Sequence, residues 1–405
     1  MTTNITTLPN GLRVVSHEMP HLSTVALGIW VGSGARHESE REHGISHLAE
    51  HMAFKGTRRR SAQQIAEEIE QVGGEINAAT SLDMTYYYSR VLQDDIAVAL
   101  DILADIVQDS LFDDGELERE REVILQEIAA TRDSPDDTVY DLFQDAAFPE
   151  QALGRPILGT PESVKGFSSD DLRRFLARRY KAGSMVLSAA GNIRHDDLVA
   201  MANAHFGSLQ PGTAENPQDA RYVGGPRLSG RNFEQAHVLL GFEGVSYRNP
   251  AFYSAQIFSG ILGGGMSSRL FQEVREKRGL CYSIYSSAWG LQDTGLLSVH
   301  ASTTPDILQD LVSVVRHELL RAVSDVPDER EVQRAKAQIK TGIAMGLESS
   351  LARSEQMARQ LLAFGRLVPA EELLERVEQV TAVGVRDAAA TMLTGSRATV
   401  ALVGM

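Results

Sequence analysis

Residues 43–52 of the chain read HGISHLAEHM, and within them His47, Glu50 and His51 form the pattern H-x-x-E-H. On a helix, positions i and i+4 lie on one face, so His47 and His51 present two imidazole nitrogens to the same point. Glu50 lies three residues after His47 and reaches that face too. The stretch therefore predicts a short helix that binds a metal ion and holds a carboxylate beside it.

A third metal ligand has to come from elsewhere, because a hydrolytic zinc site needs three protein ligands and a water. In the helix predicted over residues 116–131, Glu120, Val123, Ile124 and Glu127 share one face. Val123 and Ile124 are apolar, so we expect this face to be buried, where a carboxylate needs a partner or a metal. We predict Glu127 as the third ligand and Glu120 as the group that orients a ligand. The alternative is a solvated helix face.

The composition is that of an ordinary globular protein, with 43% hydrophobic and 23% charged residues in 405. The net charge of -15 argues against nucleic acid as a partner and fits a neutral or basic peptide. The first residues show no signal peptide, and no apolar run approaches the ~20 residues of a membrane span. The single cysteine, Cys281, permits no intrachain disulfide. We therefore expect a cytoplasmic protein without membrane association.

The other elements predicted for the first half are short helices and strands. Asn10-Gly11 is typical of a hairpin turn, and Ser61 is a suitable helix N-cap. Strands are predicted over residues 25–31, 74–80 and 85–90, and helices over residues 43–55, 61–72, 94–109 and 116–131. Strands mixed with helices, without strict alternation, favour an α+β fold.

The second half of the chain repeats the first. The strand at 85–90 and its following helix recur from residue 295 on, and the ELER of 116–119 recurs as the EVQR of 331–334, an offset of 215. A long internal repeat predicts a duplicated fold, although two unrelated segments with ordinary patterning remain the alternative.

The predicted architecture is two homologous α+β domains from an internal duplication, each a mostly antiparallel sheet packed with helices. Residues 1–208 form the zinc-binding catalytic domain, and 231–405 form the homologous domain without the metal site. Residues 209–230, rich in proline and glycine, form the linker.

The metal positions differ between the halves. By the 215-residue offset, Glu127 corresponds to Gly342 and Glu120 to Ala335, and H-x-x-E-H falls on the LGGGM of residues 262–266. None of these residues is a zinc ligand, so we expect one Zn²⁺ per chain, in the first half.

Residues 47–57, HLAEHMAFKGT, resemble the zinc helix of the pitrilysin family of inverzincin metallopeptidases. The match is closest to the catalytic subunit of the mitochondrial processing peptidase and its bacterial homologues. Glu127 follows His51 by 76 residues, the spacing of the family's third ligand, and Glu120 matches the glutamate seven residues earlier. In the second half, Arg275 and Tyr282 match an Arg/Tyr pair that assists substrate binding in the family.

The resemblance implies a zinc-dependent endopeptidase that hydrolyses unfolded peptides or short protein segments through a zinc-activated water. Glu50 would be the general base, and Tyr282 and Arg275 would assist at the substrate. From the residues alone, Arg275 also fits a solvated helix end and Tyr282 a core position.

The resemblance also suggests how substrate binds. In the family, the strand corresponding to residues 74–80 is an edge strand to which the peptide adds, so Asn77 and Ala78 are predicted substrate-binding residues. Phe54 is predicted to line a side-chain pocket, with a core phenylalanine as the alternative.

Larger members of the family hold four such domains in one chain, with the Arg/Tyr pair opposite the zinc. This chain has two, which predicts a homodimer with composite active sites. A non-catalytic assembly subunit and an active subunit that needs a separate partner remain alternatives. Six other histidines lack ligand spacing and are expected to be surface or hydrogen-bonded core residues: His37, His195, His205, His237, His300 and His317. Gly263–Gly265 lack the lysine of a P-loop and are predicted to form a flexible loop.

Overall fold

The computed structural model describes residues 2–404 and divides them into two compact units. The first unit comprises the chain up to Ile128, Pro156–Gln218 and Met345–Leu367. The second comprises Ala129–Arg155, Asp219–Ala344 and the chain from Val368 on. Each unit therefore includes one segment from the opposite half of the sequence. The domain boundaries predicted from the sequence stay a prediction.

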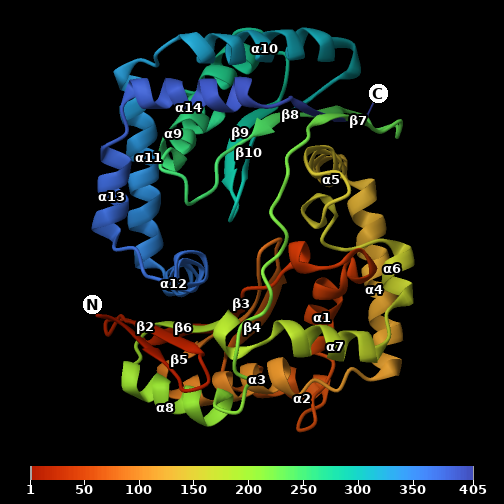
Figure 1. Cartoon of the computed structure of the whole chain (residues 1–405), viewed down its shortest axis with the longest axis vertical. Coiled ribbons are helices and arrows are strands. Elements are labelled where there is room, and N and C mark those ends of the chain that lie inside the picture. Colours follow the sequence, from red (N-terminus) through yellow and green to blue (C-terminus); the bar gives the residue numbers. More distant parts are fainter. Residues whose placement is uncertain (1, 405) are drawn as a thin grey trace. The chain divides into compact units, whose positions relative to one another are not determined.

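The sheet of the first unit has six strands, and its place in the fold can be followed in Figure 1. Its order is β1 (Thr3–Thr7), β2 (Arg13–Glu18), β6 (Met185–Gly191), β3 (Thr24–Val31), β5 (Thr85–Leu92) and β4 (Glu75–Thr80). Only β2 and β6 run parallel, so the sheet is mostly antiparallel, as expected. The predicted hairpin joins β1 to β2, and Gly11 takes the positive φ of +97° that such turns favour. β4 lies at an edge of the sheet.

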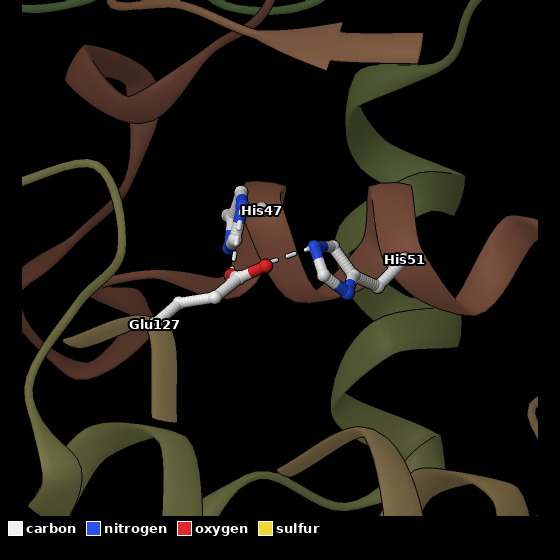
Figure 2. Close-up of side chains that lie close together, drawn as sticks. All are labelled: His47, His51 and Glu127. Atoms are coloured by element: carbon white, nitrogen blue, oxygen red, sulfur yellow. Dashed lines mark ion pairs between the residues drawn. The ribbon is translucent and has the colours of Figure 1, made fainter. Parts of the chain in front are cut away.

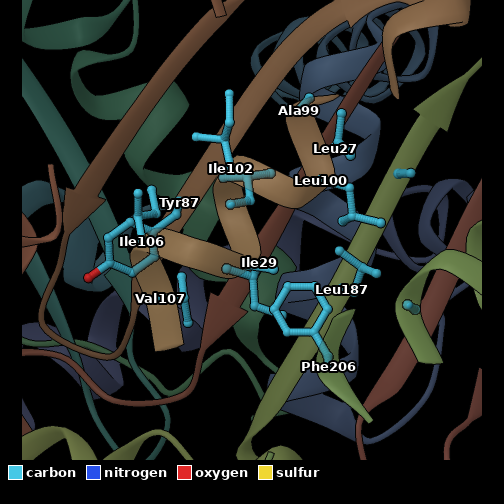
Figure 3. Packing of buried hydrophobic residues seen from close by; sticks show 14 of the residues in the cluster. Leu27, Ile29, Tyr87, Ala99, Leu100, Ile102, Ile106, Val107, Leu187 and Phe206 are labelled. Atoms are coloured by element: carbon cyan, nitrogen blue, oxygen red, sulfur yellow. The ribbon is translucent and has the colours of Figure 1, made fainter. Parts of the chain in front are cut away.

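Alternation along the strands sends apolar side chains to both faces of this sheet. Leu27 and Ile29 of β3 pack against α3 (Ile96–Gln108) and α8 (His195–Phe206), as Figure 3 shows. Trp30 points the other way, into a cluster with Met357 of α12 (Ser350–Phe364). The first unit is therefore a sheet with helices on both faces.

The metal-site region is a separate helical layer of the first unit. It contains α1 (Ile45–Ala53), most of α4 (Asp114–Asp133), α6 (Pro161–Gly166) and α7 (Ser169–Arg179). In contrast, α2 (Ala62–Gln71) packs on the core of the sheet through Ile65 and Ile69. The predicted helices are confirmed to within two residues, and Ser61 caps α2 by accepting a hydrogen bond from the N–H of Gln64.

The second unit has a five-stranded sheet in the order β7 (Gly225–Leu228), β11 (Thr399–Val403), β8 (Ala236–Glu243), β10 (Gly295–Thr303) and β9 (Ser283–Gly290). Here α9 (Phe252–Gly263), α10 (Leu308–Ser324) and α14 (Ala382–Gly395) pack with its core. The unit also holds α5 (Pro135–Ala147), α13 (Ala370–Glu378) and most of α11 (Glu329–Glu348). β7 lies inside the segment expected to be linker.

The duplication is visible in α4 and α11, which have 20 residues each and begin and end 215 positions apart. The sequence offset between equivalent strands is smaller, since β5 begins at residue 85 and β10 at residue 295. A single offset of 215 is therefore wrong for the whole chain, because loops of different length separate equivalent elements.

Among the helices within residues 2–404, none combines the length and apolar character needed to cross a membrane.

Candidate metal centre

The helix α1 is amphipathic in the way the motif predicts. Ile45, Leu48 and Met52 are fully buried in a cluster with residues of α4, α6 and α7. His47 and His51 lie on its opposite face. The buried stripe follows the i, i+3, i+7 spacing of a helix packed on one side, so the packing fixes where the histidines point.

The N-terminus of α1 is fixed by Glu38, which is itself buried. Its Oε2 accepts a hydrogen bond from the N–H of Gly44, and its Oε1 accepts one from the N–H of Ser46, both at 2.8 Å. A carboxylate at this end also interacts favourably with the helix dipole. Gly44 has φ +92°, and a Cβ there would lie 2.7 Å from Cα of Gly159, so only glycine fits.

Three metal-ligating side chains meet at the face of α1 that carries the two histidines (Figure 2). Oε2 of Glu127 lies 3.8 Å from Nε2 of His47 and 3.7 Å from Nε2 of His51. Their ligand atoms all lie within 4.8 Å of one another. The structure therefore brings together the three predicted ligands from α1 and α4.

The chemistry of these donors fits a zinc ion. Oε2 of Glu127 is buried and has no hydrogen-bond donor among residues 2–404, which is costly unless a cation binds there. Burial, followed by the nearby His51, lowers the pKa of His47 to about 4, so its imidazole is neutral and keeps a lone pair for a metal. Two imidazoles and one carboxylate are a zinc ligand set with one position left open.

Glu120 lies behind His51, as predicted. Its Oε2 is 3.0 Å from Nδ1 of His51, and its Oε1 is 2.5 Å from Nζ of Lys55. Glu120 is only 4% exposed, so its charge is balanced by these two contacts.

Glu50 points to the same side of α1 and is held by the edge strand. The hydroxyl of Thr80, the last residue of β4, donates a hydrogen bond to Oε2 of Glu50 at 2.6 Å. Burial raises the pKa of Glu50 above that of an ordinary glutamate, against the lowering effect of this hydrogen bond. A carboxylate made more basic in this way is suited to accept a proton.

The predicted burial of the α4 face is wrong at one position. Ile124 is fully buried, whereas Val123 is 39% exposed. The buried stripe of α4 runs through Leu117, Glu120, Ile124 and Ile128, so Val123 falls outside it. Glu127 lies at the margin of the stripe, partly accessible.

Arg275 and Tyr282 lie in the second unit. Arg275 belongs to a π-helical turn, Phe271–Glu276, and its guanidinium lies over the rings of Phe271 and Tyr282, at 4.6 and 5.1 Å from their centroids. Tyr282 is 79% exposed, so the alternative of a core tyrosine is wrong. The two side chains form one cation–π unit with an accessible phenol.

From the sequence we expected the glycine-rich segment, Gly263–Gly265, to be a flexible loop. The structure differs at Gly263. Gly263 is the last residue of α9, and a Cβ there would lie 2.5 Å from the backbone nitrogen of Ser286 in β9. At Gly263 the missing side chain therefore allows close packing of helix on strand.

The predicted substrate-binding residues lie near α1. Asn77 of β4 is exposed and Ala78 is buried, and β4 contacts α1. Phe54 follows α1 directly, is half-buried, and lies with its ring 6.4 Å from that of Tyr87 against the main core.

Sequence reasoning did not single out Glu38, Lys55 or Thr80. Lys55 could have been found, because it lies one helical turn after His51. Glu38 gives a weaker signal as an acidic residue shortly before a helix. Thr80 gives none, since its contact with Glu50 joins residues 30 positions apart.

Two protein families match this chain. The family described as insulinase (peptidase family M16) matches residues 13–161, and the family described as peptidase M16 inactive domain matches residues 166–339. A protein of Rickettsia felis named an uncharacterised zinc protease is 41% identical, over 94% of this chain and 92% of its own length. A protein of Bacillus subtilis with the same description is 37% identical, over 92% of this chain and 91% of its own length.

Solved structures show the same fold. A protease from Helicobacter pylori superposes with a TM-score of 0.93 at 20% identity, covering 100% of this chain and 99% of its own. A peptidase M16 inactive domain protein from Pseudomonas fluorescens gives the same TM-score and identity, with 100% and 98% covered.

Proposed function

The chain belongs to the insulinase family of zinc peptidases, and from this premise we propose that it is an endopeptidase for unfolded peptides with Glu50 as its general base. The observation that carries the proposal is the convergence of His47, His51 and Glu127 at one point, with the carboxylate of Glu50 on the same helix face.

His47, His51 and Glu127 would hold the zinc ion. A zinc ion bound there supplies a Lewis acid for the scissile carbonyl and brings the pKa of a water molecule towards neutrality. Thr80 engages Oε2 of Glu50, which leaves Oε1 to take the proton from the attacking water. The same oxygen then delivers that proton to the leaving amine.

The edge strand supports the proposed substrate class. β4 has a hydrogen-bonding partner, β5, on one side, and its last residue contacts the catalytic base. We propose that an extended peptide adds to the free edge of β4, along Asn77 and Ala78, and is thereby placed beside Glu50. Main-chain pairing requires an unfolded segment, and Phe54 is proposed to contact one of its side chains.

The charge of the chain favours peptides that carry basic residues. The net charge is -15, and the part of α4 before Glu127 exposes Glu118 and Glu122. Cationic peptides are attracted to such a surface, more strongly at low ionic strength.

We also propose a homodimer in which Arg275 and Tyr282 of one copy donate hydrogen bonds to substrate held at the other copy's metal centre. The cation–π contact holds the two donors together and leaves the phenol of Tyr282 accessible, which suits such a role. Mixing an Arg275→Ala variant with a Glu50→Gln variant should then restore part of the activity through one intact composite site. No recovery in mixed dimers would reject the arrangement.

The central experiment measures zinc content and cleavage of a fluorogenic unfolded peptide in parallel. Glu50→Gln should keep its zinc and lose about 10²- to 10⁴-fold in kcat/KM, the usual contribution of a general base. Glu70→Gln, at an exposed position of α2, is the matched control and should behave as wild type. A Glu50→Gln enzyme of full activity would reject Glu50 as the base.

The mode of substrate binding has its own test. Peptides N-methylated at single backbone amides should lose cleavage at alternating positions if they pair with β4. Uniform tolerance of N-methylation would reject strand addition and leave the zinc chemistry untouched.

A further inference from the structure

A second group of metal-ligating side chains lies entirely in the second unit. His237 of β8 pairs with Ser302 of β10, and His300 lies two residues before Ser302. Diagonal neighbours on adjacent strands project from the same face of a sheet, so the two imidazoles meet, with ring centroids 5.6 Å apart.

The helix α5 covers this face and brings a carboxylate to it. α5 packs closely on β8, because a Cβ at Gly241 would lie 2.4 Å from Cζ of Phe143. At the N-terminal end of α5, Oδ1 of Asp136 lies 3.1 Å from Nδ1 of His237 and 3.3 Å from Nε2 of His300. The three ligand atoms all lie within 4.8 Å of one another.

These distances match a coordination shell. Two ligand atoms that are each about 2.0–2.1 Å from a tetrahedral zinc ion are about 3.3 Å apart. The separations of 3.1 and 3.3 Å from Asp136 are close to this value, and closer to it than the 3.7 and 3.8 Å found at Glu127.

His300 gives independent evidence for a ligand. It is 2% exposed, and apart from the 3.3 Å ion-pair contact of Nε2 with Asp136, neither of its ring nitrogens has a hydrogen-bond partner within residues 2–404. Its ring stacks on that of Tyr140 and lies 5.0 Å from that of Tyr285, while the hydroxyls of these two tyrosines contact each other at 3.1 Å. A buried imidazole left without hydrogen bonds costs free energy that a bound cation would offset.

The protonation state of His300 is compatible with this role. Burial lowers its pKa to about 4, although Asp136 acts in the opposite direction. At neutral pH the imidazole is therefore neutral and can donate a lone pair.

We propose that Asp136, His237 and His300 bind a second divalent transition-metal ion of the zinc class. Two imidazoles and a carboxylate suit such an ion, and the exposed side of Asp136 leaves room for water as a fourth ligand. The ion ties α5, which comes from the segment Ala129–Arg155, to strands β8 and β10. Its role is structural, and the proposal does not depend on which peptide the enzyme cleaves.

The experiment counts zinc ions per chain after chelator treatment and reloading, by elemental analysis and calorimetry. Wild type should bind two, and a His47→Ala/His51→Ala background should keep one. Adding His300→Ala to this background should abolish binding, whereas adding His317→Ala, at an exposed position of α10, should not. Loss of all zinc in the background variant, or zinc retained despite His300→Ala, would overturn the proposal.

If the His300→Ala variant folds poorly, a second variant tests the same site. Asp136→Asn changes an exposed side chain and should weaken the remaining zinc by about 10-fold or more in the same background. Zinc should raise the melting temperature of the background variant and have no effect once His300 or Asp136 is replaced. An equal rise in all of these variants would contradict the assignment.

Discussion

Nδ1 of His51 lies 3.0 Å from Oε2 of Glu120, and this contact determines which nitrogen of His51 is free to bind zinc. The carboxylate accepts a hydrogen bond from Nδ1–H, so the lone pair is on Nε2, the atom that faces Glu127. Lys55, whose Nζ lies 2.5 Å from the other oxygen of Glu120, holds that carboxylate in place.

Replacing Glu120 by glutamine should weaken zinc binding by about 10- to 100-fold, since an amide fixes the tautomer of His51 less strongly than a carboxylate. The dissociation constant can be measured by competition with a chromogenic chelator. Glu122→Gln, two residues further along α4 and exposed, is the control. Equal zinc affinity in the two variants would show that Glu120 does not orient His51.

Replacing Thr80 by valine should lower kcat by about 10-fold or more and leave the zinc content unchanged. The hydroxyl makes a 2.6 Å hydrogen bond to the carboxylate of Glu50, and hydrogen bonds to charged groups contribute about 1.5–3 kcal/mol. The measurement is kcat at saturating peptide together with elemental zinc analysis. Thr391→Val, at an exposed position of α14, should match wild type. Loss of zinc in Thr80→Val would point to a structural role instead.

Replacing Glu38 by alanine should destabilise the first unit by about 2–4 kcal/mol, because the N–H groups of Gly44 and Ser46 lose their acceptor and the helix dipole loses a charge. We expect zinc affinity to fall as well, since α1 carries His47 and His51. Chemical denaturation of the zinc-free protein gives the first quantity. Glu40→Ala, a nearby exposed position, should change stability by less than about 0.5 kcal/mol. A Glu38→Ala protein as stable as this control would contradict the capping role.

The sequence predicted those parts of the site whose residues lie a few positions apart on one helix. His47, Glu50 and His51 are close in sequence, so the geometry of one helix places them together. Glu127 and Glu120 follow the same logic on α4, helped by the resemblance to a known spacing. The predicted burial of Val123 was wrong because the sequence does not show which side of α4 packs on the rest of the unit. The tertiary contacts of Leu117 and Ile124 determine that side.

The parts that the sequence did not predict depend on long-range contacts. Thr80 contacts Glu50 because β4 lies beside α1, and no local sequence pattern predicts this contact. His237 and His300, treated as structural residues for lack of ligand spacing, come together through the register of β8 and β10. Register depends on the pairing of whole strands, so ligand spacing across a sheet cannot be read from sequence distance.

We expect His37 to make the folded protein less stable in acid. This residue is buried beside Arg36 and Arg179, and its Nδ1 accepts a hydrogen bond from the N–H of Gly34. Burial, followed by these two guanidinium groups, lowers its pKa from 6.5 to about 3. In the unfolded chain His37 takes up a proton below about pH 6.5, whereas in the folded protein it does not. Folding stability should therefore fall as the pH decreases from 6.5 towards 3, by up to about 1.4 kcal/mol per pH unit from this residue alone.

His37→Asn removes the titrating group and retains an oxygen that can accept from Gly34. Between pH 7 and pH 5, wild type should lose up to about 2 kcal/mol more stability than this variant. Trp30 is buried in the first unit, so its fluorescence in a Trp289→Phe background follows unfolding of that unit in denaturant. Other buried histidines contribute equally to both proteins, and His21→Asn, at an exposed position, should retain the wild-type slope. If His37→Asn also retains that slope, then His37 takes up its proton in the folded state and does not cause the acid sensitivity.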